Sequence, residues 1–208
     1  MNKETKDKLE YFKDYYLGKT IIGLVLVFLA VFLIIHFVTR KDVVSGVCPI
    51  SPDPVNSVAV ESSYFDGFLE QNGYDPRKHT FYVVTDVYLS SELNDDVART
   101  NANMLQNVMM TKSADIYLAE EEIYSILAAS GYMADIRTIV GEEAFRQLEE
   151  DGCVFYYNDV PVGVRVDAEN AFISATGWYS EPVVIGVIED PRSEDISYAF
   201  FNLAISRE

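Results

Sequence analysis

Hydrophobic and polar positions divide the chain into one apolar block near its N-terminus and a longer region of short, alternating patterns. The block covers residues 21–38, IIGLVLVFLAVFLIIHFV, and no charged residue stands between Lys19 and Arg40. As a helix, the twenty residues between these two charges extend about 30 Å, the thickness of a bilayer core. The run exceeds the roughly 7–15 residues of a signal-peptide core. The pattern therefore predicts an uncleaved transmembrane helix over residues 20–39.

Basic residues flank this block unequally. Five lysines precede it, at positions 3, 6, 8, 13 and 19, whereas Arg40 and Lys41 are the only basic residues that follow it before Arg77. Because Lys and Arg are enriched on the cytoplasmic side of a span, this bias favours a cytoplasmic N-terminus. Residues 1–19 are predicted to form a cytoplasmic amphipathic lead-in with aromatic side chains at the membrane interface. We expect a single-pass cell-membrane protein with an extracellular C-terminal domain.

A proline-containing stretch follows the block. Residues 47–57, VCPISPDPVNS, contain Pro49, Pro52 and Pro54, which favour extended and rather stiff backbone. The pattern predicts a linker over residues 40–58 and an extracytoplasmic domain over residues 59–208. About 150 residues suffice for one hydrophobic core.

Within that domain, strand-like and helix-like patterns alternate. Strands are predicted over residues 81–89, 115–119, 153–157, 162–166 and 183–188, and helices over residues 94–112, 120–130, 141–150 and from Ser193 onward. In residues 162–166, valines alternate with Gly163 and Arg165, which indicates one buried face. Residues 183–188, VVIGVI, are apolar throughout, which is typical of a central strand. This order of strands and helices along the chain predicts a three-layer α/β domain with a mixed sheet.

The charge of the chain excludes one large class of partners. The formal net charge is −17, and from residue 42 onward 9 Lys and Arg oppose 29 Asp and Glu, a balance of −20. A nucleic-acid-binding face needs basic residues to neutralise phosphates, so no nucleic-acid partner is expected. The chain has two cysteines, Cys48 and Cys153. They are candidates for one disulfide outside the cell, and the alternative is that Cys153 is a buried thiol.

Motifs with a known reaction mechanism are absent from the sequence. It contains no nucleophile elbow, P-loop, dinucleotide-binding glycine motif or HExxH zinc motif, so we expect no enzyme, no metal and no cofactor. The three glutamates at 120–122 are interpreted as favourable charges at a helix N-terminus. Trp178, in the turn-like TGWYSEP, is a candidate ligand-binding residue, with core packing as the alternative.

Three stretches resemble the extracellular solute-binding proteins of ABC importers, which have a type 2 periplasmic-binding-like fold. They are SADIYLAEEEIYSILAASGYMADIRTIVG, PVGVRVD and EPVVIGVIEDPRSEDISYAFFNLAI. The N-terminal LEYFKDYYLGK is similar to that of small single-pass membrane proteins of Gram-positive bacteria that carry a reduced domain of this type. A complete binding protein has two lobes, so this chain would supply one lobe or a trimmed version of two.

The resemblance implies a ligand cleft bordered by Asp115, Tyr117 and Gly163, each of which could instead be a strand end or turn residue. It implies a membrane-anchored, non-catalytic ligand-binding or accessory module beside an envelope protein or transporter. A protein-interaction or scaffold module is the first alternative, and an envelope enzyme is the second.

Overall fold

The computed structural model describes residues 17–52, 60, 62–85, 87–89 and 95–206, excluding the side chains of 17, 35, 37, 38, 62, 95 and 98. These residues belong to two units, residues 1–41 and residues 42–208. The predicted lead-in over residues 1–19 lies almost entirely outside the described residues.

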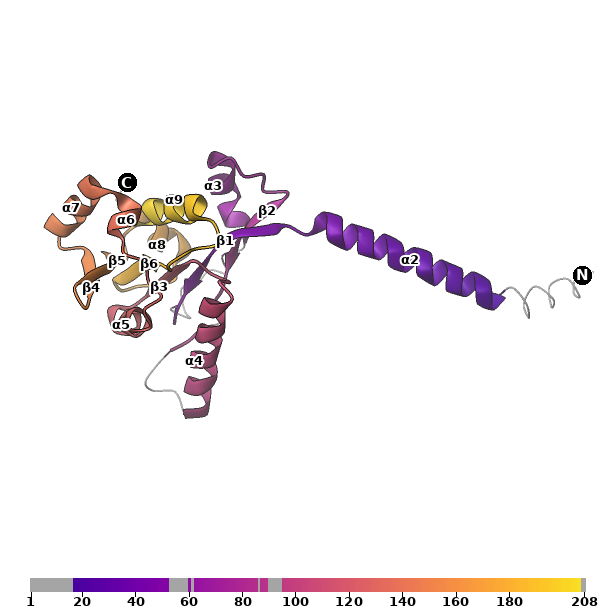
Figure 1. Ribbon diagram of the computed structural model, residues 1–208, viewed down its shortest axis with the longest axis horizontal. Helices are drawn as coiled ribbons and strands as arrows, with labels where there is room; N and C mark the ends of the chain where they lie inside the picture. The colour runs from indigo at the N-terminus through magenta and orange to yellow at the C-terminus, as the bar shows by residue number, and fades with distance from the viewer. Residues whose placement is uncertain (1–16, 53–59, 61, 86, 90–94, 207–208) are drawn as a thin grey trace, which may run out of the picture. The chain divides into compact units, whose positions relative to one another are not determined.

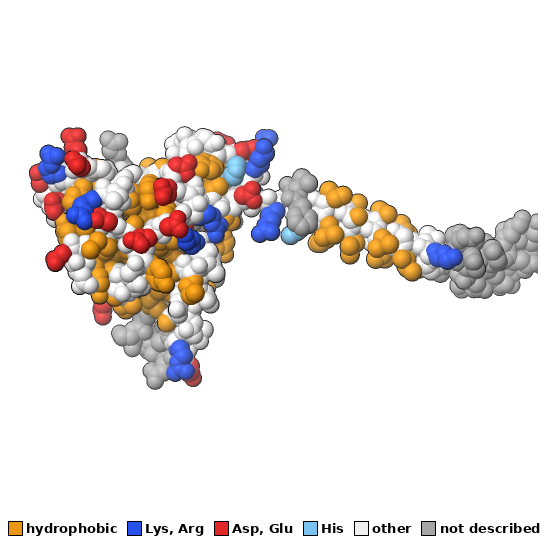
Figure 2. All heavy atoms as spheres, in the orientation of Figure 1, with side chains coloured by type: hydrophobic (Ala, Val, Ile, Leu, Met, Phe, Trp, Pro, Cys, Tyr) orange, Lys and Arg blue, Asp and Glu red, His pale blue; other side chains and the backbone are white. Residues whose placement is uncertain are grey.

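The first unit contains one helix, α2 (Leu17–Thr39). Most of its described apolar side chains, such as Leu24, Phe28 and Phe32, are more than half exposed, and Figure 2 shows hydrophobic side chains along the surface of this helix. No helix among the described residues is both long and apolar enough to cross a membrane.

The second unit is an α/β domain built on a six-stranded mixed sheet (Figure 1), and the predicted fold class is confirmed at this level. The strand order is β2-β1-β3-β6-β5-β4. The strands are β1 (Asp42–Pro49), β2 (His79–Val83), β3 (Ile116–Ala119), β4 (Val154–Tyr157), β5 (Val160–Val166) and β6 (Val183–Val187). β1 pairs in parallel with both β2 and β3. The β3–β6, β6–β5 and β5–β4 pairs are antiparallel.

Helices cover both faces of this sheet because its strands alternate apolar side chains between two core clusters. In β3, Ile116 and Leu118 belong to one cluster, and Tyr117 and Ala119 belong to the other. The first cluster packs against residues of η1 (Ser62–Phe65), α3 (Asp66–Gln71), α6 (Arg137–Val140), α7 (Glu142–Glu150), α8 (Ala171–Thr176) and α9 (Glu194–Ile205). The second packs against α4 (Asp95–Met110) and α5 (Glu121–Ala129). Both clusters lie wholly within residues 42–208, so this unit contains its own core.

The predicted linker over residues 40–58 is corrected by β1, which is an interior strand of the sheet. Val47 and Cys48 are fully buried, and β1 pairs with residues 79–83 on one side and 116–118 on the other. Prolines at the end of this segment suggested a linker, but Pro49 is the last residue of the strand, where the missing N–H disturbs the ladder least. The folded domain therefore begins at residue 42 and not at residue 59.

Other differences concern short elements. The strand predicted over residues 81–89 ends at Val83, and the six-residue helix α8 was not predicted. The side chain of Asn170 caps α8 by accepting hydrogen bonds from the N–H groups of Phe172 and Ile173, and Gly177 ends it with a positive φ of 61°. A helix of fewer than two turns has too few positions to show a periodic pattern.

Candidate functional site

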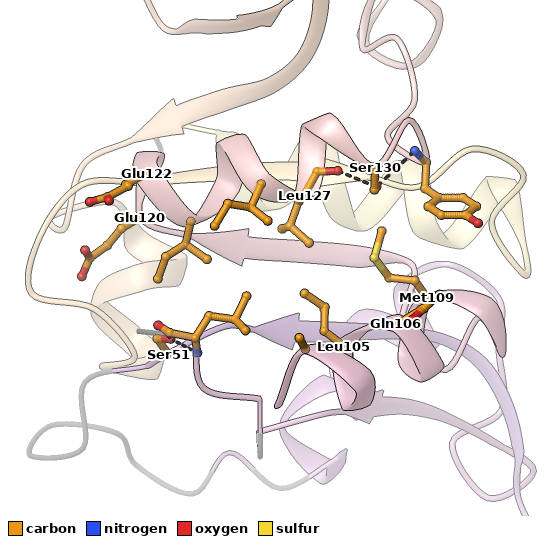
Figure 3. Close-up of a pocket in the computed structure, with 13 residues that line it drawn as sticks. Ser51, Leu105, Gln106, Met109, Glu120, Glu122, Leu127 and Ser130 are labelled. Carbon is orange, nitrogen blue, oxygen red and sulfur yellow. Dashed lines mark hydrogen bonds between the residues drawn. The ribbon is translucent and has the colours of Figure 1, made fainter. Parts of the chain in front are cut away.

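A groove of about 760 Å³ lies between α4 and α5 (Figure 3). This volume is in the range of small-molecule sites. Its walls are mainly apolar: α4 contributes Ala102, Leu105 and Met109, and α5 contributes Ile123, Ile126 and Leu127. Polar groups lie at its two ends. Glu120, Glu122 and Ser51 are at one end, and Gln106 and Ser130 are at the other.

The position of the groove follows from the strand order. Ser51 comes two residues after β1, and Glu120 directly follows β3, so the groove lies at the carboxyl ends of these parallel strands. The connection from β1 to β2 packs on one face of the sheet through Phe65, whereas the connection from β2 to β3 packs on the other face through Leu105. Connections that lie on opposite faces in this way leave a crevice between the carboxyl ends of β1 and β3. Such crevices bind ligands in open α/β sheets.

Tyr179 holds the ends of β1 and β3 together on the opposite side of the sheet from the groove. Its hydroxyl donates to the carbonyl oxygens of Ile50 and Leu118, both at 2.8 Å. The N–H of Ile50 donates to the same Leu118 oxygen, also at 2.8 Å. Burial raises the pKa of Tyr179 well above its usual value, so the phenol stays a neutral donor. These bonds fix the spacing of the strand ends that lead to Ser51 and Glu120, which line the groove.

Ser51 fixes one end wall of the groove. Its hydroxyl donates to the carbonyl oxygen of Leu89 at 2.7 Å, and the Leu89 N–H donates back to the same hydroxyl at 2.7 Å. The N–H of Ser51 also donates to Val87 at 2.8 Å. The segment that follows β2 is thereby tied to the end of β1, and the Ser51 hydroxyl has both its donor and an acceptor position in use.

The α5 wall is positioned by Tyr124, whose ring inserts against two strands that carry glycine at the contact. The Tyr124 hydroxyl donates to the Val162 carbonyl oxygen at 2.7 Å, and burial raises its pKa. A Cβ atom on Gly186 would lie 1.7 Å from this hydroxyl, and one on Gly163 would lie 3.0 Å from it. Both glycines therefore give the ring room, and α5 packs closer to the sheet than any larger residue would allow.

The three glutamates at the start of α5 have different surroundings. Glu121 is bound by Arg165 of β5, whose Nε and Nη2 donate to its two carboxylate oxygens at 2.8 and 3.0 Å. These hydrogen bonds hold the pKa of Glu121 below its usual value. Glu120 and Glu122 instead line the groove, and among the described side chains neither has an ion-pair partner. Two carboxylates are thus available to a molecule bound in the groove.

No protein-family model, curated protein or solved structure matches this chain. The site is therefore defined by its geometry alone.

Two of the predicted ligand residues, Asp115 and Tyr117, lie in the interior. The Asp115 carboxylate accepts from the Arg192 N–H at 3.0 Å and from the Ser197 hydroxyl at 3.1 Å, and Ser197 is also hydrogen-bonded to Ser45. Asp115 stands at the amino end of β3, the opposite end of this strand from the groove. Tyr117 is fully buried and bonded to the Ala114 carbonyl oxygen. Asp115 links β3 to α9 through Ser197, whereas Tyr117 packs in the core cluster that faces α4 and α5.

The other two predicted residues are also structural. Gly163 lies in β5 beneath Tyr124. Trp178 is 1% exposed in the cluster on the far face of the sheet and packs edge-on against Phe172. None of the three residues that the resemblance places at a cleft, Asp115, Tyr117 and Gly163, lines the groove, and neither does Trp178, the separate ligand-binding candidate. Large aromatic and small residues at these positions serve packing.

The candidate disulfide between Cys48 and Cys153 does not form. Cys48 is in β1, and Cys153 directly precedes β4, which is four positions away in the strand order. Four strand spacings amount to about 19 Å, whereas a disulfide requires Cα atoms within about 7 Å. Burial raises the pKa of the Cys48 thiol. Cys153 is partly exposed and borders a second surface hollow of about 330 Å³.

Glu120 and Glu122 are the groove residues that the sequence interpretation assigned to another role. The helix dipole accounts for acidic residues in the first turn of a helix, and the sequence shows no difference among three consecutive glutamates. Glu120 and Glu122 could have been placed at this site if residues 42–49 had been predicted to form a strand. Recognition of this strand would have placed its end beside the end of β3, where Glu120 stands.

Proposed function

We propose that this protein is a membrane-anchored, extracytoplasmic, non-catalytic binding module whose ligand occupies the groove between α4 and α5. The observation that carries the proposal is the groove itself, an apolar cavity with polar groups at both ends at the carboxyl ends of β1 and β3. A reduced solute-binding domain, as the sequence resemblance implies, would use such a crevice for its ligand.

The polar groups of the groove suit recognition better than nucleophilic chemistry. The Ser51 hydroxyl is occupied by the Leu89 backbone, and the Ser130 hydroxyl donates to the Leu127 carbonyl oxygen at 2.5 Å. Neither serine is hydrogen-bonded to a base that could take its proton, as nucleophilic catalysis requires. Among the described residues that line the groove there is no histidine or cysteine. The lining therefore supports binding without reaction.

The argument for the anchor rests on the sequence. Twenty residues without a charged side chain separate Lys19 from Arg40, and a helix of that length matches a bilayer core. Exposed leucine and phenylalanine side chains on α2 need an apolar environment, which lipid would supply. The excess of lysine before the span favours an extracellular binding domain.

A second candidate function uses the same groove to bind an apolar segment of a partner protein. Ile126 and Tyr132, which line the groove, are 60% and 51% exposed. Exposed apolar side chains at the rim of a groove are typical of protein-interaction surfaces.

The groove proposal predicts saturable binding of Nile red, a neutral apolar dye, to residues 42–208. Ala102 is exposed and lines the groove, so Ala102→Trp fills the cavity without disturbing the core. We expect this variant to weaken binding by about tenfold or more, as measured by the increase in dye fluorescence. Ala129→Trp makes the same exchange at an exposed position of α5 outside the groove and should leave binding unchanged. Equal binding by both variants would contradict the proposal.

The native cysteines test the proposed orientation in the full chain. A membrane-impermeant maleimide should label Cys153 on intact cells and should label Cys48 only after unfolding, because Cys48 is fully buried. Cys153→Ser should abolish the label on intact cells, and Cys48→Ser should retain it. Labelling of Cys153 that requires cell lysis would show that the domain lies on the cytoplasmic side.

A further inference from the structure

We infer that the molecule bound in this groove is an amphiphile with a cationic ammonium group, which is held by Glu120 and Glu122 while its apolar chain lies along the groove. This inference rests on the proposed function and identifies the class of ligand. Figure 3 shows the two carboxylates together at one end, with Leu105, Leu127 and Met109 in the part that leads away from them. A ligand with one charged end and one apolar chain matches this arrangement.

The pairing of Glu121 decides the local charge. Arg165 pairs with Glu121, so two of the three carboxylates at the start of α5 have no cationic partner among the described side chains. The N-terminus of a helix carries about half a positive charge, which leaves about −1.5 at this end of the groove. The helix dipole offsets only a minor part of the negative charge, and a ligand cation would find a net attraction.

No described residue in the lining offsets the negative charge of these carboxylates. Of the described residues that border the groove, none is Lys, Arg or His. The whole region from residue 42 onward has a balance of −20, which raises the local concentration of cations and lowers that of anions. An anionic amphiphile such as a fatty acid would bring a third negative charge to the same end. An ammonium group could donate hydrogen bonds to both carboxylates, and charge-assisted bonds of this kind are the stronger ones.

The test displaces Nile red from residues 42–208 with three ligands that have the same ten-carbon chain: decylammonium, 1-decanol and decanoate. Their affinities are compared in the wild type and in Glu120→Gln with Glu122→Gln. Each exposed ion pair contributes a severalfold change in affinity. We therefore expect the ratio of decylammonium to decanol affinity to fall by about tenfold in the variant, with decanoate the weakest ligand of the wild type.

A matched control separates local from overall charge. Glu142→Gln with Glu143→Gln removes the same two charges from the exposed first turn of α7, outside the groove. This variant should keep the wild-type ratio. If the ratio is the same in the wild type and the Glu120/Glu122 variant while Nile red still binds at the groove, the cationic ligand class is wrong and the groove proposal stands. If Nile red does not bind the wild type, the groove proposal fails, and this inference fails with it.

Discussion

Replacing Gly186 with alanine is expected to lower the free energy of unfolding of the 42–208 domain by about 3 kcal/mol or more. The added Cβ atom would lie 1.7 Å from the Tyr124 hydroxyl and 2.6 Å from the Val162 carbonyl oxygen. One of these neighbours belongs to the backbone of β5, and the other is a fully buried side chain, so neither can move aside without displacing β5 or α5. The measurement is urea unfolding followed by circular dichroism, which gives the change in midpoint.

Gly67 provides the matched control. It lies in α3, and a Cβ atom there would have no neighbour within 4 Å. Gly67→Ala should leave stability unchanged or raise it by up to about 1 kcal/mol, because alanine favours helix. A Gly186→Ala domain as stable as the wild type would mean that Tyr124 does not pack against β6 as described. Since Tyr124 positions α5, a folded Gly186→Ala domain should also bind Nile red more weakly.

Replacing Asp115 with alanine is expected to cost about 3 kcal/mol of unfolding free energy. The substitution removes the acceptor for the Arg192 N–H and for the Ser197 hydroxyl, and Asp115 is 1% exposed, so water cannot take its place. Asp115→Asn should cost less, because its amide oxygen still accepts and its NH₂ group can donate to Ser197. Urea unfolding of the three proteins gives the comparison.

The same variants distinguish a structural role of Asp115 from a ligand-binding role. Asp42→Ala removes an exposed aspartate at the start of β1 and should change stability by less than about 0.5 kcal/mol. A stable Asp115→Ala domain with weakened ligand binding would restore the cleft role that the sequence resemblance implied. An unstable one with normal binding after correction for unfolding would confirm the structural role.

The elements with the clearest local patterns were predicted well. The helix predicted over residues 94–112 is α4, the helix predicted over 120–130 is α5, and the apolar run at 183–188 is β6. Each of these patterns depends on residues close together in the sequence. Helical hydrogen bonds are local, and a buried central strand shows its burial in its own composition.

β1 could not be recognised in the same way. Its partners are residues 79–83 and residues 116–118, so its pairing depends on contacts with distant parts of the chain. Pro49 at its end is a signal shared by linkers and strand ends. Because β1 was not predicted as a strand, the groove could not be predicted either. The crevice exists only where the ends of β1 and β3 lie side by side.

The sequence by itself determined that the chain has an apolar block of twenty residues between Lys19 and Arg40, an acidic α/β domain and most of the helices and strands of that domain. Only the tertiary structure decided the roles of particular side chains. Glu120, Glu121 and Glu122 are identical in the sequence, yet Arg165, 44 positions away from Glu121, binds the middle one and leaves the outer two facing the groove. Asp115 and Trp178, polar and aromatic residues typical of binding sites, are enclosed in the core instead. A residue's type sets what it can do chemically, whereas its neighbours across the fold set which of those roles it performs.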